Sequence, residues 1–327
     1  MRIHMFLLLL VPFALSSARA QPLPGFGQPG GFGEQEMYST APIPGVSLVI
    51  NAPAEFSSNG KTWLVLYALP NGNSIEWTKG KKIEAGEDWH YDIQHIAAQT
   101  RFVRQLDRKN NYVVVYLATD QRSWPAWRRQ QADSAGQLIR KLVDYTTSMF
   151  SHYDPHIVLN GHSGGGSFIF GYLNAYDSVP SLVDRIAFLD SDYGYEDSLH
   201  REKLSTWLQK DNKNHLCVLA YNDSVVIYNG KPLVSPTGGT WHRSRKMQRD
   251  LANDFTFKTM EDTAFIRHSA LKGRISMMLK HNPHGLIYHT VQVERNGFIY
   301  SLLFNTKYDR PKYFRYFGDR AYDRYIE

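Results

Sequence analysis

Residues 156–173, "HIVLNGHSGGGSFIFGYL", join a short apolar run to a segment of helical spacing through a glycine-rich hinge. The run at 156–160 has the length and composition of a buried strand. Apolar residues with helical spacing resume after Gly165. The hinge itself holds one histidine and one serine among four glycines. The pattern therefore places Ser163 at a turn from a strand into a helix, among glycines that have no side chains.

Gly161, Ser163 and Gly165 fit the pattern G-x-S-x-G in the strand–turn–helix context that gives this pattern its mechanical meaning. A serine on such a turn exposes its hydroxyl, and side chains two residues away would collide with the adjacent strand or the helix start. The first amides of the following helix face a developing oxyanion. No lysine follows in the G-x-x-x-x-G-K-[ST] pattern, which excludes a P-loop. The sequence predicts that Ser163 is a catalytic nucleophile; a packing turn is the alternative.

The chain divides into three segments. Residues 1–20 start with a basic residue, continue with an apolar core of about ten residues and end in small residues, which predicts a signal peptide cut after Ala20. Such a core is shorter than the roughly 20 residues needed to span a bilayer, and we expect no membrane span elsewhere. Residues 21–38 are rich in Gly, Pro and Gln and are predicted to be flexible. Residues 39–327 are predicted to form a single domain of a secreted or periplasmic protein.

Composition narrows the classes of partner. The formal net charge of +6 is small and dispersed, so no nucleic-acid partner is expected. Cys217 is the only cysteine, which excludes an internal disulfide and a zinc–cysteine site. His90, Asp92 and His95 could be imagined as metal ligands, but two histidines five residues apart suit one helical face poorly. We therefore expect no metal and no cofactor.

Apolar runs alternate with amphipathic stretches along the domain. Strands are predicted at 45–52, 61–69, 111–119, 156–160, 185–190, 215–221 and 274–280. Helices are predicted around 87–106, 134–150, 165–176, 199–210, 241–253 and 290–304. This alternation predicts an α/β protein with a mainly parallel sheet and helices on both faces. In such sheets, sites form at the carboxyl ends of the strands.

The order of elements, together with "GHSGGGSF" at the hinge, resembles the α/β-hydrolase superfamily and secreted bacterial serine hydrolases without an assigned substrate. The resemblance covers nearly the whole domain through element order, and its motifs occupy a few short stretches. It implies esterase, lipase, peptidase or acyltransferase chemistry. It also implies the chain order nucleophile, acid, histidine.

Three histidines follow the last predicted strand and are candidates for the base. His289 precedes an apolar segment of helical spacing, where the histidine of the superfamily usually lies, and it is preferred. His284 lies in a His-Gly turn, and His281 almost within the strand end.

The triad acid has two predicted locations. Asp223 follows the strand at 215–221, the usual position in the superfamily, and is the first choice. Asp190 and Asp192 follow the earlier strand at 185–190, which some members use instead, and they stay as alternatives.

Two amide donors are expected for the oxyanion. Gly164 follows the nucleophile and supplies one of them. The turn after the strand at 61–69 supplies the other, for which we favour Asn71, with the Asn73 side chain as a helper. This turn lacks the His-Gly or Gly-Gly-Gly signature of many esterases, and a plain type I turn is the alternative.

Substrate-binding candidates lie near the predicted strand ends. Trp124, Trp127 and Arg128 are expected on the active face, where they would recognise a sugar ring, an aromatic acyl group or an anionic substrate. The alternative for both tryptophans is packing between loop and sheet. His162, which precedes the nucleophile, and Asn73 complete the candidates.

We therefore expect a serine hydrolase, first of all a carboxylic-ester hydrolase that acts through an acyl-enzyme on small-molecule or glycan-linked esters. A serine peptidase of the same fold is one alternative. A non-catalytic module that binds a glycan or peptide in the same crevice is another.

Overall fold

A computed structural model describes residues 22–327, so the predicted signal peptide and its cut after Ala20 lie outside the described residues. The strands are β1 (Glu34–Thr40), β2 (Val46–Pro53), β3 (Thr62–Ala68), β4 (Asn111–Thr119), β5 (Pro155–His162), β6 (Val183–Leu189), β7 (His215–Tyr221), β8 (Ile227–Tyr228), β9 (Lys231–Pro232), β10 (Lys258–Glu261), β11 (Phe265–Ala270) and β12 (Ile275–Lys280). The α-helices are α1 (Ile75–Lys79), α2 (Ile96–Leu106), α3 (Trp124–Gln131), α4 (Ala135–Ser148), α5 (Gly166–Asn174), α6 (Asp197–Lys210), α7 (Thr240–Leu251) and α8 (Phe298–Leu303).

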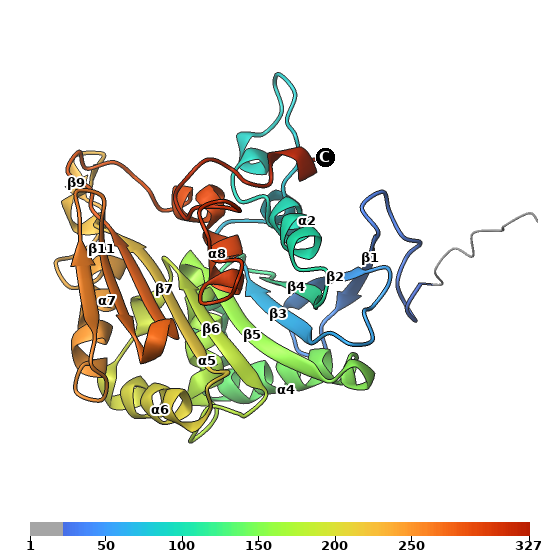
Figure 1. Ribbon diagram of the computed structural model, residues 1–327, viewed down its shortest axis with the longest axis horizontal. Coiled ribbons are helices and arrows are strands. Elements are labelled where there is room, and N and C mark those ends of the chain that lie inside the picture. The colour runs from blue at the N-terminus through green and yellow to red at the C-terminus, as the bar shows by residue number, and fades with distance from the viewer. Residues whose placement is uncertain (1–21) are drawn as a thin grey trace, which may run out of the picture.

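Ten of the strands form one sheet in the order β1-β2-β4-β3-β5-β6-β7-β12-β11-β10 (Figure 1). The strands from β4 to β12 in this order pair in parallel, and antiparallel strands extend the sheet at both ends. A short antiparallel hairpin, β8–β9, stands apart. Each predicted strand is present, which confirms the mainly parallel sheet.

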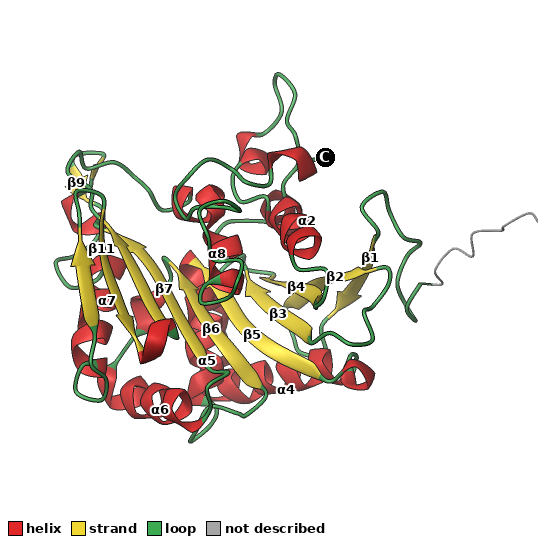
Figure 2. Ribbon diagram, viewed as in Figure 1, coloured by secondary structure: helices red, strands yellow, loops and turns green. Residues whose placement is uncertain are grey.

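Helices cover both faces of this sheet (Figure 2). Successive side chains of β3 enter two different cores. Leu64 and Leu66 belong to the core that includes α4, α5 and α6. Val65 and Tyr67 belong to the core on the side of α2 and α8. A parallel strand buried on both faces is apolar throughout, because each of its two rows of side chains meets a layer of helices. The C-terminal segment packs on the second core through Phe314 and other side chains.

The segment at 21–38 differs from its expectation. Residues 34–38 belong to β1, which pairs in register with β2, so the predicted flexibility is wrong there. Two arginines of α2 hold the start of this strand: Arg101 pairs with Glu34 at 2.5 Å and Arg104 pairs with it at 3.1 Å. Ion pairs from a distant helix and pairing along the strand thus order a polar edge strand that has little apolar surface of its own.

Candidate active site

The nucleophile candidate Ser163 lies where β5 ends and a 3-10 turn leads into α5. Its φ angle is 53°, in the left-handed region that L-residues other than glycine adopt rarely. Strain of this kind costs about 1–3 kcal/mol and persists only where the surroundings impose it. Ser163 therefore occupies the sharp turn that the glycine pattern predicts.

Backbone atoms explain the glycines around Ser163. A Cβ atom on Gly165 would lie 2.1 Å from the carbonyl oxygen of Ala68 in β3, and one on Gly166 would lie 1.7 Å from that of Ser191. The hydroxyl of Ser191 in turn donates to the carbonyl oxygen of Gly161 at 2.9 Å. Strand β3 and the loop after β6 thus approach the turn so closely that no side chain fits between them.

His289, the preferred base, lies in the loop after β12 and next to the elbow. Its ring is 4.6 Å from the ring of His162, measured between centroids, and its carbonyl oxygen is 3.1 Å from His162 Nε2. Burial, together with the neighbouring His289, lowers the pKa of His162 well below its usual value, which keeps His162 neutral. Among residues 22–327 no hydrogen bond joins Ser163 to His289; in unliganded enzymes this contact often tightens only around substrate.

The structure pairs His289 with Asp190 and not with Asp223, the first choice of acid. Nδ1 of His289 is hydrogen-bonded to Oδ2 of Asp190, which follows β6 and is fully buried. Strand register places Asp190 at the elbow, since Leu189 lies opposite His162 and the residues that follow them, Asp190 and Ser163, are therefore neighbours. Asp223 instead accepts a hydrogen bond from the amide of Thr240 at 2.8 Å.

Three buried carboxylates lie close together behind His289. The Thr240 hydroxyl donates to Asp190 Oδ1 at 2.5 Å and lies 3.4 Å from Asp223, while Asp192 accepts from Ser244 at 2.8 Å. Burial and the charge of Asp190 raise the pKa of Asp223 to about 6. Burial also raises the pKa of Asp192 well above its usual range. Asp192, the other alternative acid, does not reach the histidine.

Asn71 and Gly164, the expected oxyanion donors, lie against each other. A Cβ atom on Gly164 would be 2.0 Å from Asn71 Oδ1, and both residues line the same cavity as Ser163. Gly164 is in the first turn of a helical segment, where amides lack an intrahelical acceptor. Asn73 does not line this cavity; it lies beside Arg122 in a separate depression, so its expected role as helper is not supported.

The cavity at Ser163 has a volume of about 460 Å³. Its lining residues are Asn71, Pro125, Arg128, Ser163, Gly164, Ser167, Ser191, Tyr193 and Gly194. Sequence reasoning missed Tyr193, although it stands three residues after Asp190 at the same strand end. Burial, with a smaller effect from Asp190, raises the pKa of Tyr193, so its phenol stays protonated.

Trp124 and Trp127 are buried in the core and do not line the cavity at Ser163, so the packing alternative holds and not the preferred substrate-binding role. Their indole nitrogens donate to the carbonyl oxygens of Leu117 and Pro44, at 3.2 and 2.9 Å. The segment is a helix, α3, and residues at positions i and i+3 share a helical face. Both rings therefore point inward, and Arg128 is the only one of the three residues that reaches the cavity.

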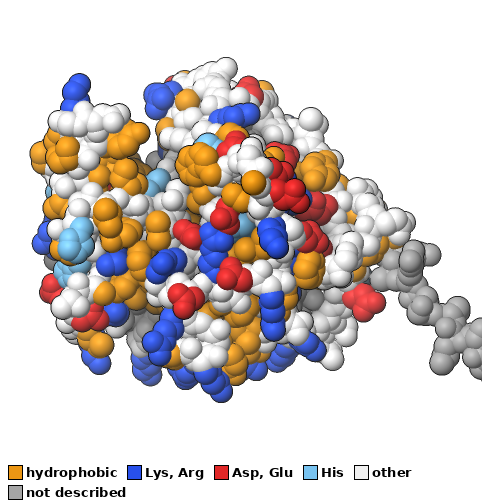
Figure 3. Space-filling view, turned by 90° about the horizontal axis from the view of Figure 1, so that it is seen from above, with side chains coloured by type: hydrophobic (Ala, Val, Ile, Leu, Met, Phe, Trp, Pro, Cys, Tyr) orange, Lys and Arg blue, Asp and Glu red, His pale blue; other side chains and the backbone are white. Residues whose placement is uncertain are grey.

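The surface beside His289 is apolar. Leu286 and Ile287, just before it, are exposed, as are Ile227 and Tyr228 on the β8–β9 hairpin. The two loops adjoin, because a Cβ atom on Gly285 would lie 3.3 Å from the carbonyl oxygen of Val225. Hydrophobic side chains gather on the left of the face seen in Figure 3, the side on which Figure 1 places β9.

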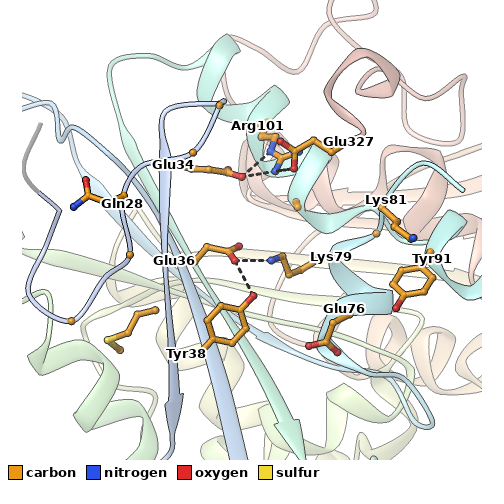
Figure 4. A pocket seen from close by; sticks show the side chains of 17 residues that line it. Gln28, Glu34, Glu36, Tyr38, Glu76, Lys79, Lys81, Tyr91, Arg101 and Glu327 are labelled. Atoms are coloured by element: carbon orange, nitrogen blue, oxygen red, sulfur yellow. Dashed lines mark hydrogen bonds and ion pairs between the residues drawn. The ribbon is translucent and has the colours of Figure 1, made fainter. Parts of the chain in front are cut away.

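A second, larger cavity of about 660 Å³ lies away from the elbow (Figure 4). Five of its charged side chains are paired with one another: Glu36 with Lys79 at 2.7 Å, and Arg101 with both Glu34 and Glu327. It shares no lining residue with the cavity at Ser163.

Within residues 22–327 no cluster of His, Cys, Asp or Glu has the geometry of a metal site. His95 is buried and pairs with Asp92 at 2.7 Å, and Asp92 also pairs with Arg320. In the same range, no helix is both long and apolar enough to cross a membrane.

The strand order β1-β2-β4-β3-β5-β6-β7-β12, with a nucleophile-type turn after β5, is that of the α/β-hydrolase fold. The predicted fold class is therefore confirmed. The sequence matches no protein-family model and no curated protein.

Solved structures resemble the chain at low identity. A feruloyl esterase module from Clostridium thermocellum, complexed with sinapinate, is 13% identical with a TM-score of 0.45, and the alignment covers 88% of this chain and 90% of that one. A siderophore hydrolase from Aspergillus nidulans is 13% identical with a TM-score of 0.43 over 91% and 99%. An acetyl xylan esterase from Aspergillus awamori is 10% identical with a TM-score of 0.41 over 77% and 93%. These similarities concern the fold alone.

Proposed function

We propose that the protein is a serine hydrolase that cleaves carboxylic esters. The observation that carries the proposal is the strained φ of 53° at Ser163 beside the hydrogen-bonded pair of His289 and Asp190. A strained serine, a histidine and a buried carboxylate are the groups that acyl transfer needs.

In the proposed reaction, Ser163 Oγ attacks the acyl carbon while its proton passes to His289 Nε2. Asp190 holds the proton on Nδ1 and stabilises the imidazolium. The amides of Asn71 and Gly164 stabilise the oxyanion of the tetrahedral intermediate. His289 then gives its proton to the leaving alcohol oxygen, the C–O bond breaks, and an acyl-enzyme forms. Water, deprotonated by the same histidine, attacks the acyl carbon of the Ser163 ester, and His289 returns the proton to Ser163 Oγ as the acyl C–Oγ bond breaks and the acid leaves.

A fluorophosphonate probe tests the nucleophile independently of substrate. We expect the probe to label Ser163, and Ser163→Ala to lose labelling together with hydrolysis of 4-nitrophenyl esters. His289→Ala should lose activity to a similar degree because the two residues act as a unit. His281→Ala is the matched control, since His281 contacts Glu261 at 3.1 Å and not the elbow. An unlabelled wild-type protein would favour a non-catalytic binding module, and preferential cleavage of peptide anilides would favour a peptidase.

We further propose that the protein is exported and that the mature chain begins at Gln21. The apolar core and small residues of 1–20 support this proposal. The intact mass of protein purified from a secreting host tests it, and a mass that includes residues 1–20 would contradict it.

A further inference from the structure

Among residues 22–327, Arg128 is the only charged side chain that lines the cavity at Ser163. It projects from α3, one position beyond the buried Trp127. Arginine remains protonated at any physiological pH, so the cavity holds a permanent positive charge.

Contacts with α5 fix the position of this guanidinium. Nη1 donates to the carbonyl oxygen of Ser167 at 3.0 Å and lies 3.2 Å from its hydroxyl. The side chain crosses α5 at Gly171, where a Cβ atom would lie 3.0 Å from Nε. The absence of a side chain at Gly171 thus lets Arg128 pack against α5, the helix that follows the turn at Ser163.

No carboxylate of residues 22–327 neutralises Arg128. Nε of Arg128 is buried without a hydrogen-bond partner. The side chain takes part in no ion pair within residues 22–327. Arg101 in the other cavity is the contrast, because Glu34 and Glu327 both pair with it (Figure 4). Burial without such a partner lowers the pKa of Arg128 from its ordinary value. A half-buried cation without an anion is costly unless an anion arrives from outside the chain.

We propose that Arg128 binds a carboxylate of the substrate, so that the preferred esters carry a negative charge near the scissile bond. This inference rests on the proposed function and names its substrate class. Because Nε is buried against α5, a carboxylate would bind the fork formed by the two terminal nitrogens of the guanidinium, and no acidic residue among those that line the cavity competes for it. The cavity volume of about 460 Å³ is of the size that holds small organic ligands.

Matched pairs of esters test the proposal. Mono(4-nitrophenyl) adipate and its methyl ester differ only in a carboxylate on the acyl side, and 4-acetoxybenzoate and its methyl ester differ in the same way on the alcohol side. We expect the wild-type kcat/KM to favour the charged member of one pair by about 10-fold or more, as one charge-assisted contact allows. Arg128→Gln should abolish that preference, and Arg128→Lys should restore part of it.

Arg129→Gln is the matched control, because Arg129 is the exposed neighbour of Arg128 and does not line the cavity. It should leave the preference of the wild type intact. Equal kcat/KM for the two members of both pairs in the wild type would overturn the proposal. Equal losses for charged and neutral esters in Arg128→Gln would also overturn it, since Arg128 would then only pack against α5.

A binding measurement tests the carboxylate site separately from the proposed hydrolase function. Adipate should raise the Tm of Ser163→Ala, whereas dimethyl adipate should not, and the shift should vanish when Arg128→Gln is added. If Ser163 resists fluorophosphonate but this shift is present, the hydrolase proposal fails and the carboxylate site stands. If the probe labels Ser163 and no Arg128-dependent shift or preference is found, the carboxylate site fails alone.

Discussion

Nδ1 of His289 is hydrogen-bonded to Oδ2 of Asp190, although 99 residues separate them in the chain. The second oxygen of Asp190 accepts the hydroxyl proton of Thr240 at 2.5 Å. The carboxylate is therefore held from both sides and cannot rotate without breaking one of the two bonds. This arrangement keeps the imidazole proton on Nδ1 and leaves Nε2 free to accept a proton.

Asp190→Asn should reverse that tautomer. The Thr240 hydroxyl needs an acceptor, so the amide oxygen will face Thr240 and the amide nitrogen will face His289. Nδ1 must then accept a hydrogen bond from that amide nitrogen. The ring proton therefore moves to Nε2, and the histidine can no longer act as a base. We expect kcat to fall by about 10⁴-fold, as the same change does in a serine protease triad. Asparagine tolerates the φ of 49° at this position, so Tm should stay near the wild-type value.

Asp223→Asn is the matched control for that experiment. Asp223 contacts Thr240 and not the histidine, so Asp223→Asn should lower kcat by no more than about 10-fold. This loss is far smaller than the one expected when the carboxylate that contacts His289 is changed. A loss of activity confined to Asp223→Asn would instead identify Asp223 as the acid.

Strain at Ser163 predicts a difference in stability between two inactive variants. Alanine keeps a Cβ atom at a φ of 53°, whereas glycine adopts this conformation without steric cost. We expect the free energy of unfolding of Ser163→Gly to exceed that of Ser163→Ala by about 1 kcal/mol. Urea unfolding of the two proteins measures the difference. Equal values would show that the turn does not impose the strained conformation.

Asp223 should make stability depend on pH with a definite sign. Its folded pKa of about 6 lies above the usual 3.8, so the folded state binds the proton more tightly than the unfolded state. The resulting stabilisation is complete below pH 3.8 and is lost as the pH rises through about 6. Asp223→Asn does not titrate, so its stability relative to the wild type should increase by about 2–3 kcal/mol between pH 4 and pH 7. Urea unfolding of both proteins across this range would contradict the prediction if the difference stayed constant.

Gly164→Ala should damage the oxyanion site through a side chain, and a second change should reverse part of that damage. The new Cβ would lie 2.0 Å from Asn71 Oδ1 and displace Asn71. We expect kcat to fall by about 10²–10³-fold, the usual cost of one lost oxyanion donor. Adding Asn71→Gly removes the clashing atoms and keeps the amide, so activity should partly return.

Gly165→Ala provides the comparison for that rescue. Its Cβ would meet the backbone oxygen of Ala68 at 2.1 Å, which no side-chain change can remove. Unfolding experiments should show a loss of about 1–3 kcal/mol, as for other overpacked positions. Failure of Asn71→Gly to improve Gly164→Ala would show that the clash at Gly164 also involves the backbone.

Local patterns in the sequence predicted seven of the ten strands of the sheet and the turn on which the candidate nucleophile lies. Central parallel strands such as β4 carry apolar side chains on both faces, which makes them easy to predict. The glycines around Ser163 indicate the turn directly. His289 follows the last parallel strand, so its position could be inferred from chain order. Strand β1 escaped prediction because its sequence, "EQEMYST", has few apolar residues and relies on Arg101 and Arg104.

Which carboxylate pairs with His289 depends on packing that no local pattern contains. Asp190 and Asp223 both follow buried strands, and only the strand register and Thr240 decide which one meets His289. The tryptophans are a different case. The sequence does contain the signals for the start of a helix at this segment, and these signals would have placed both rings on one helical face. Ser123 caps α3 by accepting from the amide of Ala126, and Pro125 lies in its first turn.

The glycine turn also determines which positions around the cavity can be varied by directed evolution to change the substrate. Main-chain atoms of Ala68 and Ser191 leave no room for a side chain at Gly165 and Gly166, so library members changed at these positions would lose stability. The opposite wall includes side chains from the first turn of α3 and from the turn that precedes α6, among them Pro125 and Tyr193. Diversity confined to that wall can reshape specificity while the reaction centre is inherited unchanged.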